Sequence, residues 1–158
     1  MVITLEQRTA DTVRVYFEKA KNLEIKRTLP QKAQPLEEAL EDYGNTLLPG
    51  ADSFGQIICV DGKYIGDVWC YCIDRNNEPN CMISYCIFEP DYWSKGIATA
   101  AVRMFIKNIC VKYHVKTIGA FTFSHNIASI KVLEKNGFLV MEEYEEEGIL
   151  SKYLRCEC

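Results

Sequence analysis

The chain has 158 residues, of which 48% are hydrophobic and 25% are charged, and its formal net charge at pH 7 is −4. This length and composition indicate one globular domain, residues 1–158, that can bury a core of its own. The acidic balance argues against nucleic acid as a main partner, because phosphate binding needs a basic surface.

Hydrophobic patterning in the first half predicts a strand at 2–7, helices at about 9–21 and 35–43, and strands at 54–60 and 63–73. Thr9 can cap the first helix through its hydroxyl. A polar turn then leads to Pro35, which suits the first turn of a helix, and residues 44–52 read as a loop. Asp61-Gly62 is a strong hairpin signal between the two strands.

The second half predicts a strand at 81–88, a helix from 96 to 113, a strand at 117–123, a helix at 126–137 and a final hairpin, 139–144 with 149–154. A helical crossover predicts that strand 117–123 lies parallel to strand 81–88. Asn126 can cap the helix that Gly137 ends. The acid run Glu145–Gly148 is interpreted as a solvated turn of the hairpin.

The stretch after strand 81–88 predicts an anion site. Pro90 ends the strand because proline cannot donate to a sheet ladder. Gly96 and Ala98 leave the backbone N–H groups at the next helix start open, and Lys95 adds a positive charge. A diphosphate-sized anion fits such a helix start. The alternative is an ordinary strand–loop–helix in which Gly96 serves only close packing.

The eight cysteines predict reduced core thiols and no metal site. No Cys-x-x-Cys occurs, and most cysteines lie in apolar, strand-like runs, where cysteine behaves as a small hydrophobe. Cys156 and Cys158 are expected to be exposed enough to oxidise. No stretch is long enough to cross a bilayer and the first residues do not form a signal peptide, so we expect a cytoplasmic protein without a membrane partner.

The predicted order β-α-α-β-β-β-α-β-α-β-β resembles the GNAT superfamily of N-acetyltransferases. Tyr92-Trp-Ser-Lys-Gly-Ile-Ala-Thr99 resembles the acetyl-CoA loop of that family, with Gly96 and Ala98 in its last two defining places. The stretch Asn126 to Phe138 resembles the Asn…Ser…Leu-Glu-Lys-x-Gly-Phe helix of the RimJ/RimL-type branch. The two motifs occur in this order about thirty residues apart.

This resemblance implies an α+β fold with a twisted, mixed and mostly antiparallel sheet of about seven strands flanked by about four helices. It implies direct transfer of an acetyl group from acetyl-CoA, in a ternary complex and without a metal, to a primary amine of a small molecule or a peptide N-terminus. We expect a monomer or a homodimer.

The resemblance also assigns residues to the cofactor. It places the pantetheine arm along the strand Tyr85, Cys86, Ile87 and Phe88. It places the diphosphate on the loop Trp93, Ser94, Lys95, Gly96, Ile97, Ala98 and Thr99, and Asn126 and Ser129 near the thiol. Leu133 stands where many members have a tyrosine thought to act as general acid, which leaves Ser129 as the best-placed partner of the leaving thiolate.

Asp67 and Glu89 are the candidate bases for removing the amine proton. Each candidate has a structural alternative: Asp67 could face solvent, Asn126 could be only a helix cap, Ser129 could only solvate the first helical turn, and Trp93 could be a packing residue. Tyr85 and His125 are further possibilities, with structural roles favoured. Two other functions stay open, a non-catalytic acetyl-CoA sensor, suggested by Leu133, and an interaction domain without a cofactor.

Overall fold

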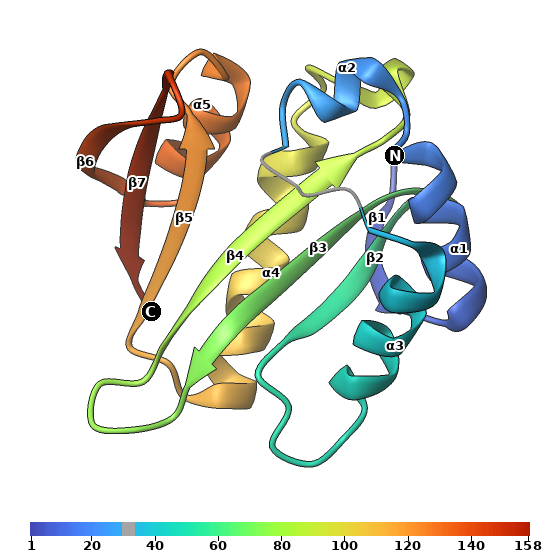
Figure 1. Cartoon of the computed structure of the whole chain (residues 1–158), viewed down its shortest axis with the longest axis horizontal. Helices are drawn as coiled ribbons and strands as arrows, with labels where there is room; N and C mark the ends of the chain where they lie inside the picture. The colour runs from blue at the N-terminus through green and yellow to red at the C-terminus, as the bar shows by residue number, and fades with distance from the viewer. Residues whose placement is uncertain (30–33) are drawn as a thin grey trace.

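A computed structural model describes residues 1–29 and 34–158 (Figure 1). The strands are β1 (Ile3–Gln7), β2 (Phe54–Val60), β3 (Lys63–Asp74), β4 (Asn80–Ile87), β5 (Thr117–Phe123), β6 (Leu139–Glu146) and β7 (Ile149–Glu157). The α-helices are α1 (Ala10–Lys19), α2 (Leu23–Lys26), α3 (Leu36–Thr46), α4 (Ile97–Tyr113) and α5 (Ile127–Lys135), and Pro90–Tyr92 forms a short 3-10 helix.

The strands make one seven-stranded sheet in the order β1-β2-β3-β4-β5-β7-β6. Its pairs are antiparallel except β4–β5, which is parallel because α4 crosses over between these strands. The predicted fold class is therefore confirmed. Thr9 and Asn126 cap α1 and α5 with their side chains, as predicted.

Three local predictions need correction. The predicted polar turn before Pro35 contains the short helix α2, and its residues 30–33 lie outside the described residues. Helix α3 continues through Gly44 to Thr46 instead of ending at Tyr43. The first half of the acid run, Glu145 and Glu146, is strand, because the turn of the last hairpin needs only Glu147 and Gly148, both with positive φ.

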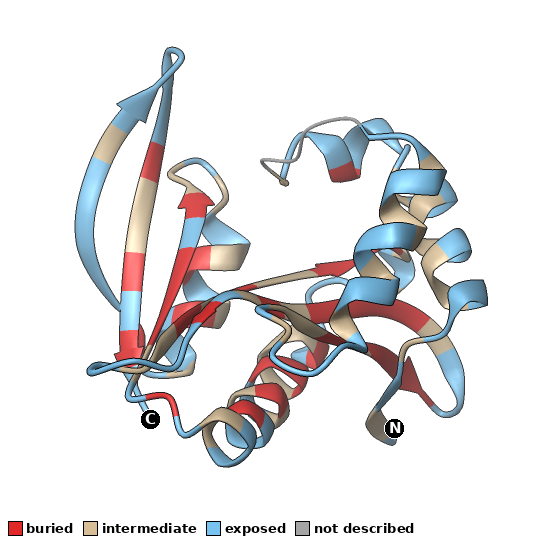
Figure 2. Cartoon of the chain, turned by 60° about the horizontal axis from the view of Figure 1, so that its bottom comes forward, coloured by how far each residue is buried: buried red, intermediate tan, exposed pale blue. Residues whose placement is uncertain are grey.

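Helices cover both faces of the sheet. Figure 2 shows the buried residues concentrated along the central strands and on the side of α4 that faces them. Phe105 on α4 packs there with Ile58, Ile83 and Ile118 of the strands. A smaller cluster on the other face joins Ile25 of α2 to Cys86 and Phe88. No helix of the described chain is long and apolar enough to cross a membrane.

The sheet opens between β4 and β5. Their parallel pairing joins only Asn80–Met82 to Thr117–Gly119, and the strands then diverge (Figure 1). The Phe88 amide donates to the Ile65 carbonyl of β3. Because peptide groups alternate sides along a strand, those of Ile83, Tyr85 and Ile87 face the opening. The divergence thus leaves a row of backbone polar groups directed toward β5.

The cysteine prediction holds for the core thiols and fails elsewhere. Cys59, Cys70, Cys81 and Cys86 are buried free thiols, as predicted. Cys72 is exposed at an irregularity of β3, and Cys156 is buried, against expectation. Cys158, expected to be a thiol prone to oxidation, forms a disulfide with Cys110 near the end of α4. The absence of metal stays a prediction that elemental analysis would check.

We expect reduction of Cys110–Cys158 to lower the melting temperature without unfolding the protein at 25 °C. A bridge between residues 48 apart in sequence stabilises by about 4 kcal/mol in the chain-entropy account. For a chain of this size, that corresponds to a shift of roughly 10 °C. Calorimetry with and without reductant measures it. Cys158→Ser should melt at the lower temperature under both conditions.

Cys72→Ser is the matched control, because it removes an exposed free thiol and leaves the bridge intact. It should melt like the wild type under both conditions. Alkylation of the unreduced protein under denaturing conditions, followed by mass spectrometry, should modify six cysteines. Eight modified cysteines would contradict the disulfide.

Candidate functional site

The opening between β4 and β5 forms a cleft of about 610 Å³. Its walls are β4, the start of α4, β5, α5 and the segment around α2. The lining residues are Ile25, Thr28, Leu29, Ile83, Ser84, Tyr85, Cys86, Ile87, Tyr92, Trp93, Ser94, Gly96, Ile97, Ala98, Thr99, Ala120, Phe121, Thr122, Asn126, Ile127, Ala128, Ser129, Lys131, Val132, Leu133 and Lys135. The cleft therefore brings the two sequence motifs together.

The start of α4 presents open amides to the cleft. Gly96, the N-cap, has φ +77° and provides no side-chain cap. The first backbone bond of the helix runs from the Ala100 amide to the Gly96 carbonyl, so the amides of residues 97–99 have no partner within α4. Ser94 is also left-handed, with φ +58°. Open amides at a helix start bind anions, which supports the predicted anion site.

Trp93 closes part of the backbone edge of β4. Its indole Nε1 donates to the Ile87 carbonyl at 2.8 Å, and 39% of its surface is exposed. The ring therefore lines the cleft in a fixed position. The Phe88 side chain packs with Ile25 on the other face and is not part of the cleft wall. The backbone edge open to a ligand thus consists of the Ile83 carbonyl, the amide and carbonyl of Tyr85, and the Ile87 amide.

The positive charge in the cleft comes from residues that the sequence analysis missed. Lys131 and Lys135 of α5 line the cleft, whereas Lys95 does not and places its Nζ 5.8 Å from the centre of the Tyr92 ring. Among the described residues, no carboxylate lines the cleft, so its side chains carry a formal charge of +2 from these two lysines. The i, i+4 spacing of Lys131 and Lys135 on a predicted helix was the available signal.

The start of α5 holds two hydroxyl groups in contact. The Ser129 amide donates to Asn126 Oδ1 at 3.2 Å, so Asn126 is a helix cap as well as a cleft residue. The Tyr85 hydroxyl of β4 donates to Ser129 Oγ at 3.0 Å. Burial raises the pKa of Tyr85 to about 12. Leu133, one turn further along, is buried.

Asp67 is enclosed in the fold. It is 2% exposed, which overturns the alternative that it faces solvent. Its Oδ2 accepts from Arg8 Nε at 2.8 Å, and its Oδ1 accepts from the Tyr64 hydroxyl. Burial raises the pKa of Asp67, and Arg8 and Tyr64 offset only part of this effect. Its catalytic role stays a prediction, but both of its oxygens already have partners.

We expect Asp67→Asn to affect stability more than activity. Removing one partner of a buried ion pair costs roughly 3 kcal/mol, because the other charge loses its counterion. Thermal melting and kcat at a temperature where the variant is folded measure the two effects. Glu143→Gln, which removes a surface pair with Lys152 at 3.9 Å, is the control and should cost less than about 1 kcal/mol. A hundredfold loss of kcat at unchanged melting temperature would show that Asp67 is the base.

Glu89 follows β4 and points toward α1. Its Oε1 accepts from Lys19 Nζ at 3.0 Å, and it does not line the cleft. The role of Glu89 as a base stays a prediction. It would require the ion pair between Glu89 and Lys19 to open. His125 is exposed and stacks on Phe123 outside the cleft.

A second cleft of about 500 Å³ lies on the side of the sheet that carries α1 and α3. Its lining residues are Arg8, Val13, Tyr16, Gln34, Glu38, Ala39, Asp42, Tyr43, Thr46, Ser53, Phe54, Asp67, Trp69 and Cys70. One arginine and three carboxylates give these residues a formal charge of −2. Trp69 pairs with Ser84 across β3 and β4, and Ser84 lines the first cleft, so only one strand spacing separates the two walls.

The chain matches a known protein family. The model of the acetyltransferase (GNAT) domain matches residues 3–139. No curated protein sequence matches the chain.

Solved structures share the fold at low sequence identity. The Vibrio cholerae spermidine N-acetyltransferase, solved with CoA and spermine, has a TM-score of 0.86 at 15% identity, over 98% of this chain and 95% of that one. The aminoglycoside acetyltransferase AAC(6')-Ib, solved with coenzyme A, has a TM-score of 0.81 at 18% identity, over 99% and 95%. RimL, a ribosomal L7/L12 alpha-N-protein acetyltransferase solved with coenzyme A, gives 0.82 at 16%, over 99% and 94%.

Proposed function

Because this chain belongs to the GNAT acetyltransferase family, we propose that it is an acetyl-CoA-dependent N-acetyltransferase that acts on a cationic primary amine. The observation that carries the proposal is the cleft between β4 and β5, where an open helix start, an open strand edge and a hydroxyl pair converge. The sensor and the interaction domain are the alternatives that the experiment below separates from it.

The first cleft suits the cofactor. The diphosphate binds the amides of residues 97–99, and Lys131 and Lys135 add the charge that an anionic ligand needs. The amide groups of the pantetheine arm pair with the exposed backbone of Ile83 and Tyr85, as an added strand would. The arm leads the thioester toward Ser129. Acetyl-CoA is thus the co-substrate, and no metal is part of this proposal.

The second cleft suits the acceptor. Its formal charge of −2 opposes the +2 of the first cleft, so each attracts a ligand of the opposite sign. Trp69 and Tyr43 add aromatic faces that favour cations. A small-molecule amine or a peptide N-terminus entering this cleft comes within one strand spacing of the first.

The chemistry is a direct displacement in a ternary complex. The ammonium form of the amine gives up one proton to a carboxylate or to water, and the freed nitrogen lone pair forms the new N–C bond to the thioester carbonyl. The nitrogen loses its second proton to water as the amide forms. The C–S bond breaks, and its electron pair leaves with the CoA sulfur. A peptide N–H on the open edge of β4 donates to the carbonyl oxygen while that oxygen carries negative charge.

The test uses purified protein, acetyl-CoA and a panel containing a polyamine, an aminoglycoside and a peptide with a free N-terminus. We expect release of free CoA thiol together with an amine that is roughly 42 Da heavier, because an acetyl group replaces one hydrogen on its nitrogen. A neutral primary amine of similar size is the matched control and should react more slowly. CoA binding, read as a rise in melting temperature, is measured in parallel.

The other outcomes separate the alternatives. A thermal shift with CoA and no acetylated amine would favour the sensor. Neither a shift nor a product would favour the interaction domain. Equal rates for the neutral and the cationic amine would contradict the assignment of the acidic cleft to the acceptor.

A further inference from the structure

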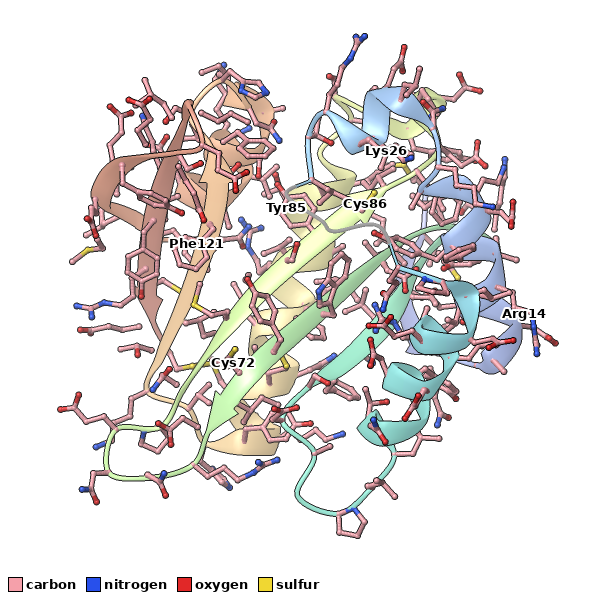
Figure 3. All side chains as sticks on the ribbon, viewed as in Figure 1. Arg14, Lys26, Cys72, Tyr85, Cys86 and Phe121 are labelled. Atoms are coloured by element: carbon pink, nitrogen blue, oxygen red, sulfur yellow. A yellow bond between two sulfur atoms is a disulfide. The ribbon has the colours of Figure 1, made fainter. Side chains whose placement is uncertain are left out.

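The hydroxyl groups of Tyr85 and Ser129 form a pair across the first cleft. Tyr85 lies near the end of β4 and Ser129 in the first turn of α5, and Figure 3 shows the Tyr85 side chain in the space between the two. Their oxygens are 3.0 Å apart. The two residues are 44 positions apart in sequence, so only the fold brings them together.

The direction of this bond decides where the Ser129 proton can go. Tyr85 donates and Ser129 Oγ accepts. Within residues 1–29 and 34–158, the Ser129 hydroxyl has no second hydrogen-bond partner. The Ser129 amide is held by Asn126, which fixes the first turn of the helix. With its acceptor side occupied, the Ser129 hydroxyl can point its own proton into the cleft.

We propose that Tyr85 is a positioning residue that keeps the Ser129 proton directed at the sulfur atom of the leaving CoA. This inference rests on the proposed function and concerns the same cleft. The Tyr85 bond also polarises the Ser129 hydroxyl, because hydrogen bonds in a chain strengthen one another where water is scarce.

The pair works by hydrogen bonding and does not deliver a proton. The pKa of Tyr85 is raised to about 12 by burial, whereas an ordinary thiol has a pKa of about 8.5. Complete transfer from tyrosine to thiolate is therefore unfavourable by about three orders of magnitude. The C–S electron pair stays on sulfur as a thiolate that accepts the Ser129 hydrogen bond, and solvent protonates it after release. No other reactant is needed.

The test is a double-mutant cycle of Tyr85→Phe and Ser129→Ala. Tyr85→Phe keeps the ring and removes the hydroxyl, which leaves the Ser129 proton free to turn toward a backbone carbonyl of its own helix. We expect a roughly tenfold fall in kcat, the worth of one hydrogen bond, with KM for acetyl-CoA unchanged. In the Ser129→Ala background, the same change should have no further effect.

Tyr113→Phe is the control, because Tyr113 does not line the cleft and its hydroxyl makes no hydrogen bond within the described chain. It should keep wild-type kcat. A purely structural role of Tyr85 would give equal losses in both Ser129 backgrounds.

Wild-type kcat in Tyr85→Phe, or equal losses in both backgrounds, would overturn this inference and leave the proposed function standing, since the wild type is then already an active acetyltransferase. A wild type that acetylates no amine would overturn the proposed function and this inference with it. The CoA thermal shift of Tyr85→Phe should equal that of the wild type, which distinguishes positioning from binding.

Discussion

Gly96→Glu is expected to abolish the rise in melting temperature that CoA or acetyl-CoA gives to the wild-type protein. At a hundredfold excess over the dissociation constant, a ligand stabilises by about 2.7 kcal/mol, which is roughly 5–10 °C for a chain of this size. The glutamate places a negative charge beside the open amides of α4, where the diphosphate binds. The expected shift in the variant is close to zero.

The effect of backbone strain at this position must be separated from the effect of the glutamate charge. Gly96 has φ +77°, and an added Cβ meets nothing within 4 Å, so a side chain there costs backbone strain of about 1–2 kcal/mol but makes no clash. Gly148→Glu is the matched control. Gly148 has φ +80° and an equally open surrounding, and it lies in the β6–β7 turn away from the cleft. It should melt lower yet keep the full ligand shift.

Gly96→Ala divides the effect further, because it adds the strain without the charge. We expect a lower melting temperature with most of the ligand shift retained. If Gly96→Glu keeps the shift of the wild type, the diphosphate does not bind at the start of α4. If Gly148→Glu loses it too, the effect is general destabilisation.

The sequence predicts best what a few neighbouring residues determine. Asp61-Gly62 specifies its hairpin because both residues can adopt positive φ, and the structure gives them 49° and 83°. Thr9 and Asn126 cap helices because a short polar side chain can accept a hydrogen bond from the amide three residues later in the chain. The open start of α4 belongs to the same class, since Gly96 alone decides it.

Contacts between distant residues lay outside what such patterns reveal. Asp67 was predicted as a candidate base, and its partner Arg8 lies 59 residues earlier, just after the edge strand β1. Cys110 is one of several half-buried positions on α4, and no local sequence pattern pairs it with Cys158. These pairings follow from the strand order and the α4 crossover, which only the assembled sheet fixes.

In the candidate site, too, local motifs were predicted and contacts between distant residues were missed. Trp93 was predicted from the motif, but its bond to the Ile87 carbonyl, which removes one acceptor from the strand edge, depends on how the loop folds back on β4. The acidic second cleft was missed because its three carboxylates come from two separate segments: Glu38 and Asp42 from α3, and Asp67 from β3. Only the folded chain brings these carboxylates together in one cleft.

Ser129→Ala is expected to lower kcat by about a hundredfold or more while CoA binding stays nearly intact. A donor that meets charge developing in the transition state is worth about 10² to 10³ in rate. Ser129 is placed for this role because it lies one turn before the buried Leu133, on the same face of α5, at the helix end that favours negative charge.

Ser124→Ala is the control for this variant. Ser124 follows β5, its hydroxyl donates to Glu143 outside the cleft at 3.1 Å, and its loss should leave kcat unchanged. Ser129→Thr keeps a hydroxyl at the same position and should retain most of the activity. Steady-state kinetics give kcat and KM, and the CoA thermal shift gives binding independently of turnover.

The pattern of losses identifies what Ser129 does. A fall in kcat without a change in the CoA thermal shift marks an interaction made mainly in the transition state. If the thermal shift falls in step with kcat, Ser129 binds the cofactor in its ground state and is not the thiolate partner. If kcat falls only a few-fold, water fills the space left by the hydroxyl and meets the thiolate instead.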